Sequence, residues 1–440
     1  MNVASGPPVG GGDERGPAAA VTVRSAGLAG LVALAWAATL AAERADVVAG
    51  TSAAAANHLL FAGVACTAIA AAVPKFVAVW SDAPLRWPRA ARLAAPLVAA
   101  GAAGVALGLL TAHVTVLAAG GVTLAVGLWT LAAATLRTLL PVRPWDATER
   151  CLAAGTTALA VGSLAGVTLA AGRTTGTASA WGVTVVDLAT AHATLVVIGG
   201  VLTVAYGGVF QLSAMLTGAS ETDAETRLQH AVSVVHPVAA TALAGGRVVG
   251  MEAVALVGGL TVAAVACVVG GLVARRLWRG TESSAATRRY WGFAAGTPLW
   301  GGLAALTWVR APLTRGGVLG GAVAEVVLWG AVGLLVVGSL YHVVPFLVWL
   351  DTYADRIGLE PVPAVEDLYV AGIERVDGWA FALGIGCLAV ARGSGWASLG
   401  TVGVTLAGVA VVGFVANLAV VVHDHASWDL VGRTTARSAG

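Results

Sequence analysis

Apolar residues in this chain form long runs separated by short polar gaps, and arginine recurs in those gaps. Crossing a lipid bilayer takes about 20 mostly apolar residues. Two runs, Arg92–Arg137 and Asp377–Asp424, are about twice that length, so each is expected to turn back once, near 111–113 and at Arg392–Gly395. The pattern therefore predicts twelve membrane-spanning helices. Their expected ranges are 24–43, 57–78, 91–111, 113–136, 151–172, 185–215, 230–246, 251–274, 290–309, 318–349, 371–391 and 396–422.

The predicted fold class is all-α, a polytopic membrane helical bundle of about 12 transmembrane helices. Lipid-facing backbone must satisfy its own hydrogen bonds, and a membrane barrel would alternate polar and apolar residues, which this chain does not. Hydrophobic residues make up 58% and charged residues 11% of the chain, with no long polar segment that could form a soluble domain. We therefore expect residues 21–430 to form one transmembrane domain. Residues 1–20 are expected to be a disordered cytoplasmic tail and residues 431–440 a short cytoplasmic tail.

Basic residues are unevenly divided between the two sides of this topology. With the N-terminus placed inside, the inner gaps carry 19 of the 25 lysines and arginines, and the outer gaps carry the other 6. The positive-inside rule then predicts a multi-pass protein of the cell membrane with both termini in the cytoplasm. The lipid bilayer is the expected partner. Basic residues interleaved with aromatic residues in one patch are not found, so nucleic acid is not an expected partner.

Ionisable residues within the predicted spans are the candidate site residues, because charge inside a bilayer is costly and usually has a role. His58 opens the second helix, His192 lies early in the sixth, and Glu325 lies about two turns into the tenth. All three enter from the outer side, as do His113 and Asp187, so the five could converge there. Simpler interpretations stay open: imidazoles can face headgroups, and Asp187 can cap a helix. A carboxylate at the expected depth of Glu325 must pair, bind a cation or stay protonated.

Other histidines and cysteines give weaker signals. His230 and His236 are six residues apart and fall on different helix faces unless Pro237 breaks the helix. The tract His423–His425 resembles a metal-binding motif, but it lies where the last helix leaves the membrane, which favours an interfacial role. The four cysteines stand singly and are interpreted as small packing residues. They are Cys66, Cys151, Cys267 and Cys387.

Three stretches of sequence together resemble a known family. The second helix reads His58-Leu-Leu-Phe-Ala-Gly63, the sixth contains Ala191-His-Ala-Thr194, and the tenth ends Tyr341-His-Val-Val-Pro-Phe-Leu-Val-Trp349. These resemble orphan membrane proteins related to haem–copper oxidase subunit I, including the NnrS-like group, in which an Ala-His-Ala-His-like start and a Tyr-Lys-Ile-x-Pro-Phe-Leu-Val-Trp-like end recur. The motifs run from residue 57 to 369, and the helix count extends the likeness to nearly the whole chain.

The resemblance implies haem ligation by histidines of helices 2 and 10 and copper ligation from helices 6 and 7. Carried over by position, it makes His58, His192 and His342 candidate haem ligands, and His192 and Glu325 candidate metal ligands. The family's helix 7 His-His pair and helix 10 His-x-His pair are absent, and Thr194 replaces the second histidine of the helix 6 motif. We therefore do not expect copper or a complete binuclear centre; a single histidine-ligated haem and a site with no metal both stay open. The implied role is linked to respiration or nitrogen-oxide handling.

Two other functions remain open from the sequence: a secondary transporter of a small solute, and a non-catalytic membrane scaffold. A transporter built from two six-helix halves would place its site near the midplane on broken helices. Three arcs of four helices each would favour the oxidase-like interpretation instead. Whether the chain is an enzyme, and whether it binds a respiratory partner subunit or a small molecule, is left open.

The charge asymmetry makes a testable prediction about topology. Green fluorescent protein fused after Gly440 should fluoresce, and alkaline phosphatase fused there should be inactive, because the phosphatase needs an oxidising compartment for its disulfides. Fusions after Arg173, in an expected outer loop, should show the opposite result. The reverse pattern at both positions would contradict the assigned orientation.

Overall fold

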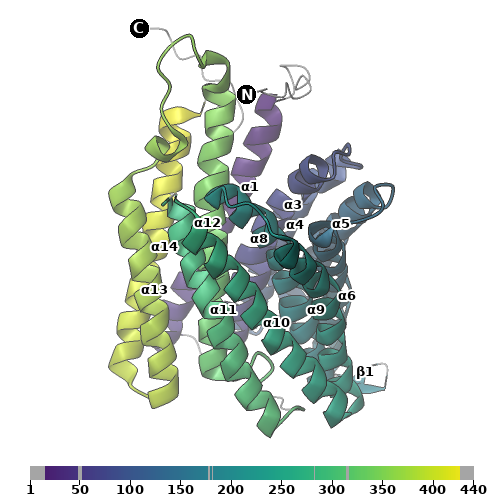
Figure 1. Cartoon of the computed structure of the whole chain (residues 1–440). Helices are drawn as coiled ribbons and strands as arrows, with labels where there is room; N and C mark the ends of the chain where they lie inside the picture. The colour runs from purple at the N-terminus through teal and green to yellow at the C-terminus, as the bar shows by residue number, and fades with distance from the viewer. Residues whose placement is uncertain are drawn as a thin grey trace.

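The computed structural model describes residues 15–47, 52–176, 179–180, 182–281, 283–313 and 317–426. It is an all-α polytopic membrane bundle. Ten of the long helices in these ranges are continuous α-helices (Figure 1). They are α1 (Arg15–Arg44), α4 (Pro88–Thr111), α5 (Val114–Leu139), α6 (Ala147–Thr175), α9 (Asp223–Val249), α10 (Glu252–Arg279), α11 (Ala285–Arg310), α12 (Ala322–Thr352), α13 (Ala371–Ser394) and α14 (Ala397–His425).

Two further long helices each contain a π-helical segment in the middle. We call the second long helix span 2, the sixth span 6 and the tenth, which is α12, span 10. Span 2 and span 6 each consist of three consecutive segments. Span 2 consists of α2 (Ser52–Asn57), η1 (His58–Ala65) and α3 (Cys66–Trp80). Span 6 consists of α7 (Val185–Ala193), η2 (Thr194–Leu202) and α8 (Thr203–Thr217). Short elements complete the described chain: the paired strands β1 (Ser179–Ala180) and β2 (Val183–Thr184), and the 3₁₀ turns η3 (Ala354–Arg356) and η4 (Val365–Leu368).

The predicted fold class is confirmed, and each predicted range corresponds to a long helix. Eleven helices in the described residues are long and apolar enough to cross a membrane. The twelfth long helix, α11, is not among them; it carries Arg288 and Arg289 near its start and Pro298 in its middle, and it packs between α10 and α12. The largest boundary difference is α1, which begins at Arg15, within the stretch predicted as a tail. The rest of the predicted N-terminal tail and the predicted C-terminal tail lie outside the described residues.

Three of the helices occupy the interior of the bundle. Successive long helices pack side by side, and α14 returns to α1, so the chain closes into a ring. Buried residues make up 78% of the apolar stretch of span 2, 78% in span 6 and 67% in span 10, against 33–56% in the other eight candidate spans. The interior helices are thus the second, sixth and tenth long helices, so every fourth long helix is an interior one. Segment η1 touches both η2 and α12, so the three meet in the middle.

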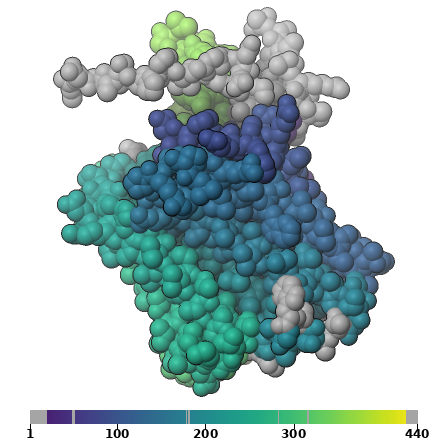
Figure 2. Space-filling model, turned by 90° about the vertical axis from the view of Figure 1, so that its right-hand side faces the viewer, coloured from purple at the N-terminus to yellow at the C-terminus, as the bar shows by residue number. Residues whose placement is uncertain are grey.

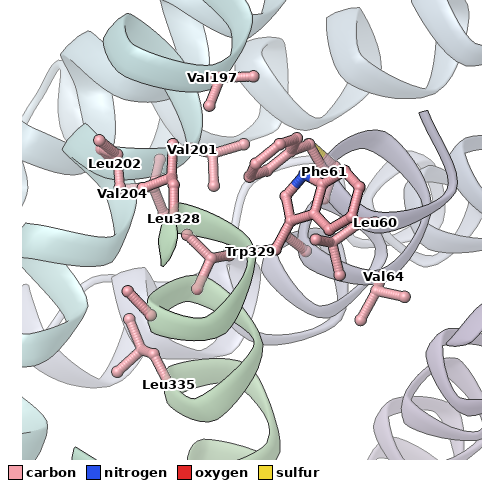
Figure 3. Packing of buried hydrophobic residues seen from close by; sticks show 14 of the residues in the cluster. Leu60, Phe61, Val64, Val197, Val201, Leu202, Val204, Leu328, Trp329 and Leu335 are labelled. Atoms are coloured by element: carbon pink, nitrogen blue, oxygen red, sulfur yellow. The ribbon is translucent and has the colours of Figure 1, made fainter. Parts of the chain in front are cut away.

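The centre of the bundle is a dry layer of side chains from these three spans. Figure 3 shows Leu60 and Phe61 from η1, Val197 from η2, and Leu328 and Trp329 from α12 pointing toward one another. All five are buried, with at most 7% of their surface exposed. Such packing excludes water and separates the two ends of the bundle from each other. We call the end where α1 begins and α14 ends the arginine-rich end, and the other end, where η1 begins, the histidine end.

Glycines allow the outer helices to pack with their backbones in contact. A Cβ atom at Gly101 would lie 2.3 Å from the backbone nitrogen of Leu124, and one at Gly108 would lie 2.4 Å from that of Leu117. Any side chain at these positions would force α4 and α5 apart. Small residues at helix contacts are the usual source of close packing in membranes. From the side (Figure 2), the blue helices of the first part of the chain pack directly against the teal helices that follow.

Two adjacent glycines in α9 test this account of packing. A Cβ at Gly246 would lie 2.5 Å from the backbone nitrogen of Ala255 in α10, whereas one at Gly245 would have nothing within 4 Å. We expect Gly246→Ala to destabilise the protein by about 1–3 kcal/mol through overpacking. Gly245→Ala should be neutral or stabilise by up to ~1 kcal/mol, because alanine favours the helix. Thermal unfolding in detergent measures both, and equal effects would refute the packing argument.

Candidate functional site

Two histidines meet at the histidine end of the bundle. His58 is the first residue of η1 in span 2, and His192 lies near the end of α7 in span 6. Their ring centroids are 6.1 Å apart and their planes are within 20° of parallel. Both side chains are half-buried. The structure therefore brings together two of the predicted site residues, which are 134 positions apart in the sequence.

Each imidazole is held in place by a hydrogen bond to a backbone carbonyl. Nδ1 of His58 lies 2.7 Å from the carbonyl oxygen of Ala54, and Nδ1 of His192 lies 2.8 Å from that of Gly162. A carbonyl oxygen can only accept, so Nδ1 must carry the proton in both rings. In a neutral ring, Nε2 is then left with a free lone pair, and within the described residues neither Nε2 has a hydrogen-bond partner. This arrangement is typical of histidines that bind metals through Nε2.

Local backbone irregularity accompanies both histidines. The π-helical segment η1 begins at His58, and η2 begins two residues after His192. π-helical segments are uncommon and often occur at functional sites, because they change the direction of side chains along a helix. A glycine in α6 leaves room for the second ring: a Cβ at Gly166 would lie 2.8 Å from Cε1 of His192. Neither π segment was anticipated from the sequence.

Glu325 lies closer to the start of its helix than predicted. Gly320 and Gly321 have φ angles of +96° and +95°, which a helix cannot contain, so α12 begins only at Ala322. The carboxylate therefore lies in the first helical turn, where the helix dipole favours negative charge, and not two turns deep. One of its oxygens accepts a hydrogen bond of 2.8 Å from the amide of Asn57, the residue before His58.

Asn57 connects Glu325 to the wall of the histidine site. The indole N–H of Trp329 donates to the side-chain oxygen of Asn57 at 2.8 Å, so this amide links span 2 to span 10. No hydrogen bond or ion pair joins Glu325 to either imidazole within the described ranges. Its contact with the site is thus indirect, through the residue that precedes His58.

The three interior spans each carry one of these ionisable residues near the histidine end. The sequence separation is 134 residues from His58 to His192 and 133 from His192 to Glu325. Equal spacing on helices four apart indicates a threefold repeat of the four-helix unit. That spacing is visible in the sequence and is a signal from which the interior helices could have been identified.

His342, the third candidate haem ligand, lies elsewhere. It is 17 residues beyond Glu325 in the same helix, about 25 Å along the axis, toward the arginine-rich end. Its ring stacks on Phe346, with centroids 6.0 Å apart. The structure therefore does not bring His342 to the His58–His192 pair.

The helix α9 runs unbroken through Pro237. His236 therefore points to a different side of the helix from His230, as their spacing predicts, and it is buried. Nε2 of His236 contacts the carbonyl oxygen of Ile198 in η2 at 3.0 Å, and its ring packs against Tyr206 at 4.8 Å between centroids. His425 likewise takes a structural partner, since its Nδ1 lies 2.9 Å from the hydroxyl of Tyr353. Neither histidine reaches the pair at the histidine end.

A buried arginine lies beside span 6. Arg247, in the last turn of α9, is 4% exposed. It donates to the hydroxyl of Thr194 at 3.0 Å and to the carbonyl oxygens of Pro312 and Val318 at 3.2 and 3.1 Å. Thr194 lies two residues after His192, and its hydroxyl anchors this arginine. The contacts tie α9 and the segment before α12 to the start of η2.

The arginine-rich end contains two ion-pair clusters that sequence reasoning missed, the first buried and the second partly exposed. In the first, Arg289 of α11 pairs with Glu374 and Asp377, one turn apart on α13, and Asp377 also accepts a hydrogen bond from Tyr341 of α12. Asn417 of α14 donates to the Tyr341 hydroxyl at 3.1 Å, so four helices are joined. The second cluster joins α9 and α10 with the turn before α9. Its members are Arg275, Arg276, Arg279, Glu221 and Glu225.

These clusters have the features of structural ion pairs and not of a reactive site. Each arginine has carboxylate partners, and buried charges are stable only when paired and hydrogen-bonded. Their sequence signal was weak, because each residue lies near a helix end, where an interfacial position explains it equally well. No group of three or more histidine, cysteine, aspartate or glutamate side chains in the described ranges is arranged to hold one metal ion.

Comparison with known proteins gives no family assignment. No family model matches the chain, and no curated protein matches it significantly. The arrangement of the site must therefore be interpreted from its own geometry.

The Arg289 cluster predicts a large effect on stability. Arg289→Met leaves the buried carboxylate of Asp377 without its cation, so we expect a loss of about 3–5 kcal/mol in the free energy of unfolding. The matched control is Arg356→Ala, which removes a pair with Glu360 that is 54% exposed on both sides and should cost no more than ~1 kcal/mol. Thermal unfolding in detergent compares them. Similar losses in the two variants would show that the cluster is not buried as described.

Proposed function

We propose that this protein is an oxidase subunit I-like membrane protein that binds haem iron through His58 and His192, without a complete binuclear centre. The observation that carries the proposal is the pairing of two imidazoles whose Nδ1 atoms are both fixed to backbone carbonyls. Both Nε2 atoms are left available for a metal.

The donor set and its spacing fit a metal held between the two rings. If one metal were bound by Nε2 of both rings at about 2.0–2.1 Å, the ring centroids would lie up to about 6 Å apart. The separation of 6.1 Å agrees with this value. Histidine is a common axial ligand of haem iron. His58 and His192 would hold the haem iron, and a bound haem would supply one-electron transfer at this site.

The chain's own residues fix the orientation and environment of the pair. The carbonyl oxygens of Ala54 and Gly162 hold each ring in one tautomer, which strengthens Nε2 as a ligand. Asn57, held by Glu325 and Trp329, fixes the start of η1 and with it the position of His58. The buried layer around Phe61 keeps water from reaching the site from the arginine-rich end.

The interior position of every fourth helix favours this proposal over a two-half transporter. Three repeated units of four helices, each giving its second helix to the centre, account for the burial of spans 2, 6 and 10. A chain of two six-helix halves gives no reason for that period.

A role in respiratory electron transfer or nitrogen-oxide handling belongs to the same proposal. So do the cell-membrane location and the placement of the arginine-rich end in the cytoplasm.

Spectroscopy of the purified protein tests the proposal directly. We expect a Soret absorption band and iron in a ratio of one per chain, because two fixed imidazoles saturate one haem. His58→Ala and His192→Ala should each reduce haem retention at least about tenfold, which corresponds to ~1.4 kcal/mol of binding free energy.

The matched control is His342→Ala, which removes a half-buried histidine from the same bundle at the other end. It should leave the spectrum unchanged. A protein with neither iron nor a Soret band after expression with ample haem would overturn the proposal and leave the scaffold interpretation. Loss of the spectrum in all three variants would point to general misfolding, and melting temperatures would identify that case.

A further inference from the structure

A cavity lies between the interior helices, on the arginine-rich side of the central dry layer. Its volume is about 100 Å³ and it is not fully enclosed. Most of the walls come from α3 and the last residue of η1, from η2 and α8, and from α12, with α1, α6 and α11 completing them. It is thus built from the same three interior spans as the histidine pair, but it lies on the other side of the layer and shares no residue with that site.

The lining of this cavity changes in polarity along its length. The end nearest the middle of the bundle is formed by Ala65, Val201 and Val332 and is wholly apolar. Tyr290 and Ser339 line it closer to the arginine-rich end, and their hydroxyls are hydrogen-bonded to each other at 2.9 Å. A ligand that matches this gradient has an apolar tail directed at the bilayer midplane and a polar group near the arginine-rich end.

One cation of α3, Lys75, lies beside the cavity-lining residues of that helix without being one of them. Lys75 follows Ala71 and Ala72 by four and three residues, and both of these alanines line the cavity, so helical geometry places Lys75 on the same face one turn nearer the arginine-rich end. Its side chain is half-buried, and within the described residues its ammonium has no ion pair or hydrogen bond. It is also the only lysine among 25 basic residues. A half-buried ammonium of this kind is stabilised by an anion.

We propose that this cavity binds a fatty acid, with its hydrocarbon chain between spans 2, 6 and 10 and its carboxylate on Lys75. The lining from Ala65 to Phe76 extends about 16 Å along the helix axis, long enough for much of such a chain. A cavity of about 100 Å³ encloses only part of one hydrocarbon chain, and its open side leaves room for the rest. This small volume suits one chain better than the two of a phospholipid. This inference is independent of haem binding.

Titration with the fluorescent fatty acid cis-parinaric acid tests the site in protein purified in a neutral detergent. We expect saturable binding of one probe per chain, displaced by palmitate. Lys75→Met should weaken displacement by palmitate about tenfold while leaving displacement by hexadecanol unchanged, because only the acid uses the charge. Lys75→Arg should retain most of the affinity for palmitate.

Substitutions at two glycines provide a test and a matched control for the hydrocarbon part of the site. A Cβ at Gly208 in α8 would meet nothing within 4 Å, and Gly208 lines the cavity, so Gly208→Leu fills the cavity without a backbone clash. We expect it to abolish binding of the acid and the alcohol alike. Gly271→Leu in α10 adds the same side chain at an exposed position with equally open surroundings and should bind normally.

Two results would overturn the inference. Binding that is unchanged in both Lys75→Met and Gly208→Leu would show that Lys75 only anchors the helix at the headgroups. Displacement of the probe by dioleoyl phosphatidylglycerol, but not by palmitate, would show that a diacyl lipid is the occupant. Melting temperatures equal to the wild type confirm folding. If Gly208→Leu does not fold, Ala72→Leu fills the same cavity from α3.

Discussion

Lipid offers no hydrogen bonds and little stabilisation to charge, and this constraint governs the whole bundle. It explains why the backbone is helical nearly throughout and why the buried charged side chains of the described residues have partners inside the protein. Arg289 meets two carboxylates, Arg247 meets carbonyl and hydroxyl oxygens, and each imidazole of the histidine pair donates to a carbonyl. What lipid cannot stabilise must be stabilised by a neighbouring helix. Among the polar groups without a partner in the described residues, the two Nε2 atoms and the ammonium of Lys75 lie at the proposed ligand sites.

Three interior helices divide the molecule into layers with different chemistry. At the histidine end, spans 2, 6 and 10 present His58, His192 and Glu325 at nearly equal sequence intervals. In the middle, Phe61 and its neighbours form a dry layer (Figure 3). Toward the arginine-rich end the same helices separate around a cavity, and the ion-pair clusters tie the outer helices together beyond it. The two proposed ligands would thus occupy opposite sides of one packed layer, without contact between them.

Most of the fold could be predicted from the sequence, because a run of 20 apolar residues between charges has few alternatives to a membrane helix. Helix ends were harder to predict: hydropathy placed the start of the tenth helix before Gly320 and Gly321, whose backbone conformation delays it to Ala322. The approach of His58 to His192 followed from topology, although the π-helical segments beside them have no recognised sequence signal. The Arg289 cluster was missed because its partners lie 85–88 residues away, and pairing over that distance depends on tertiary packing.

Cross-linking measures most directly whether the imidazoles of spans 2 and 6 approach each other in the membrane. The four native cysteines would be replaced by alanine, and His58→Cys and His192→Cys introduced together. A short bifunctional thiol reagent should then join the two helices in nearly every chain, because the native rings are 6.1 Å apart. The pair His58→Cys with His342→Cys should not react within one chain. Cross-linking of the second pair but not the first would contradict the arrangement on which the proposed haem site depends.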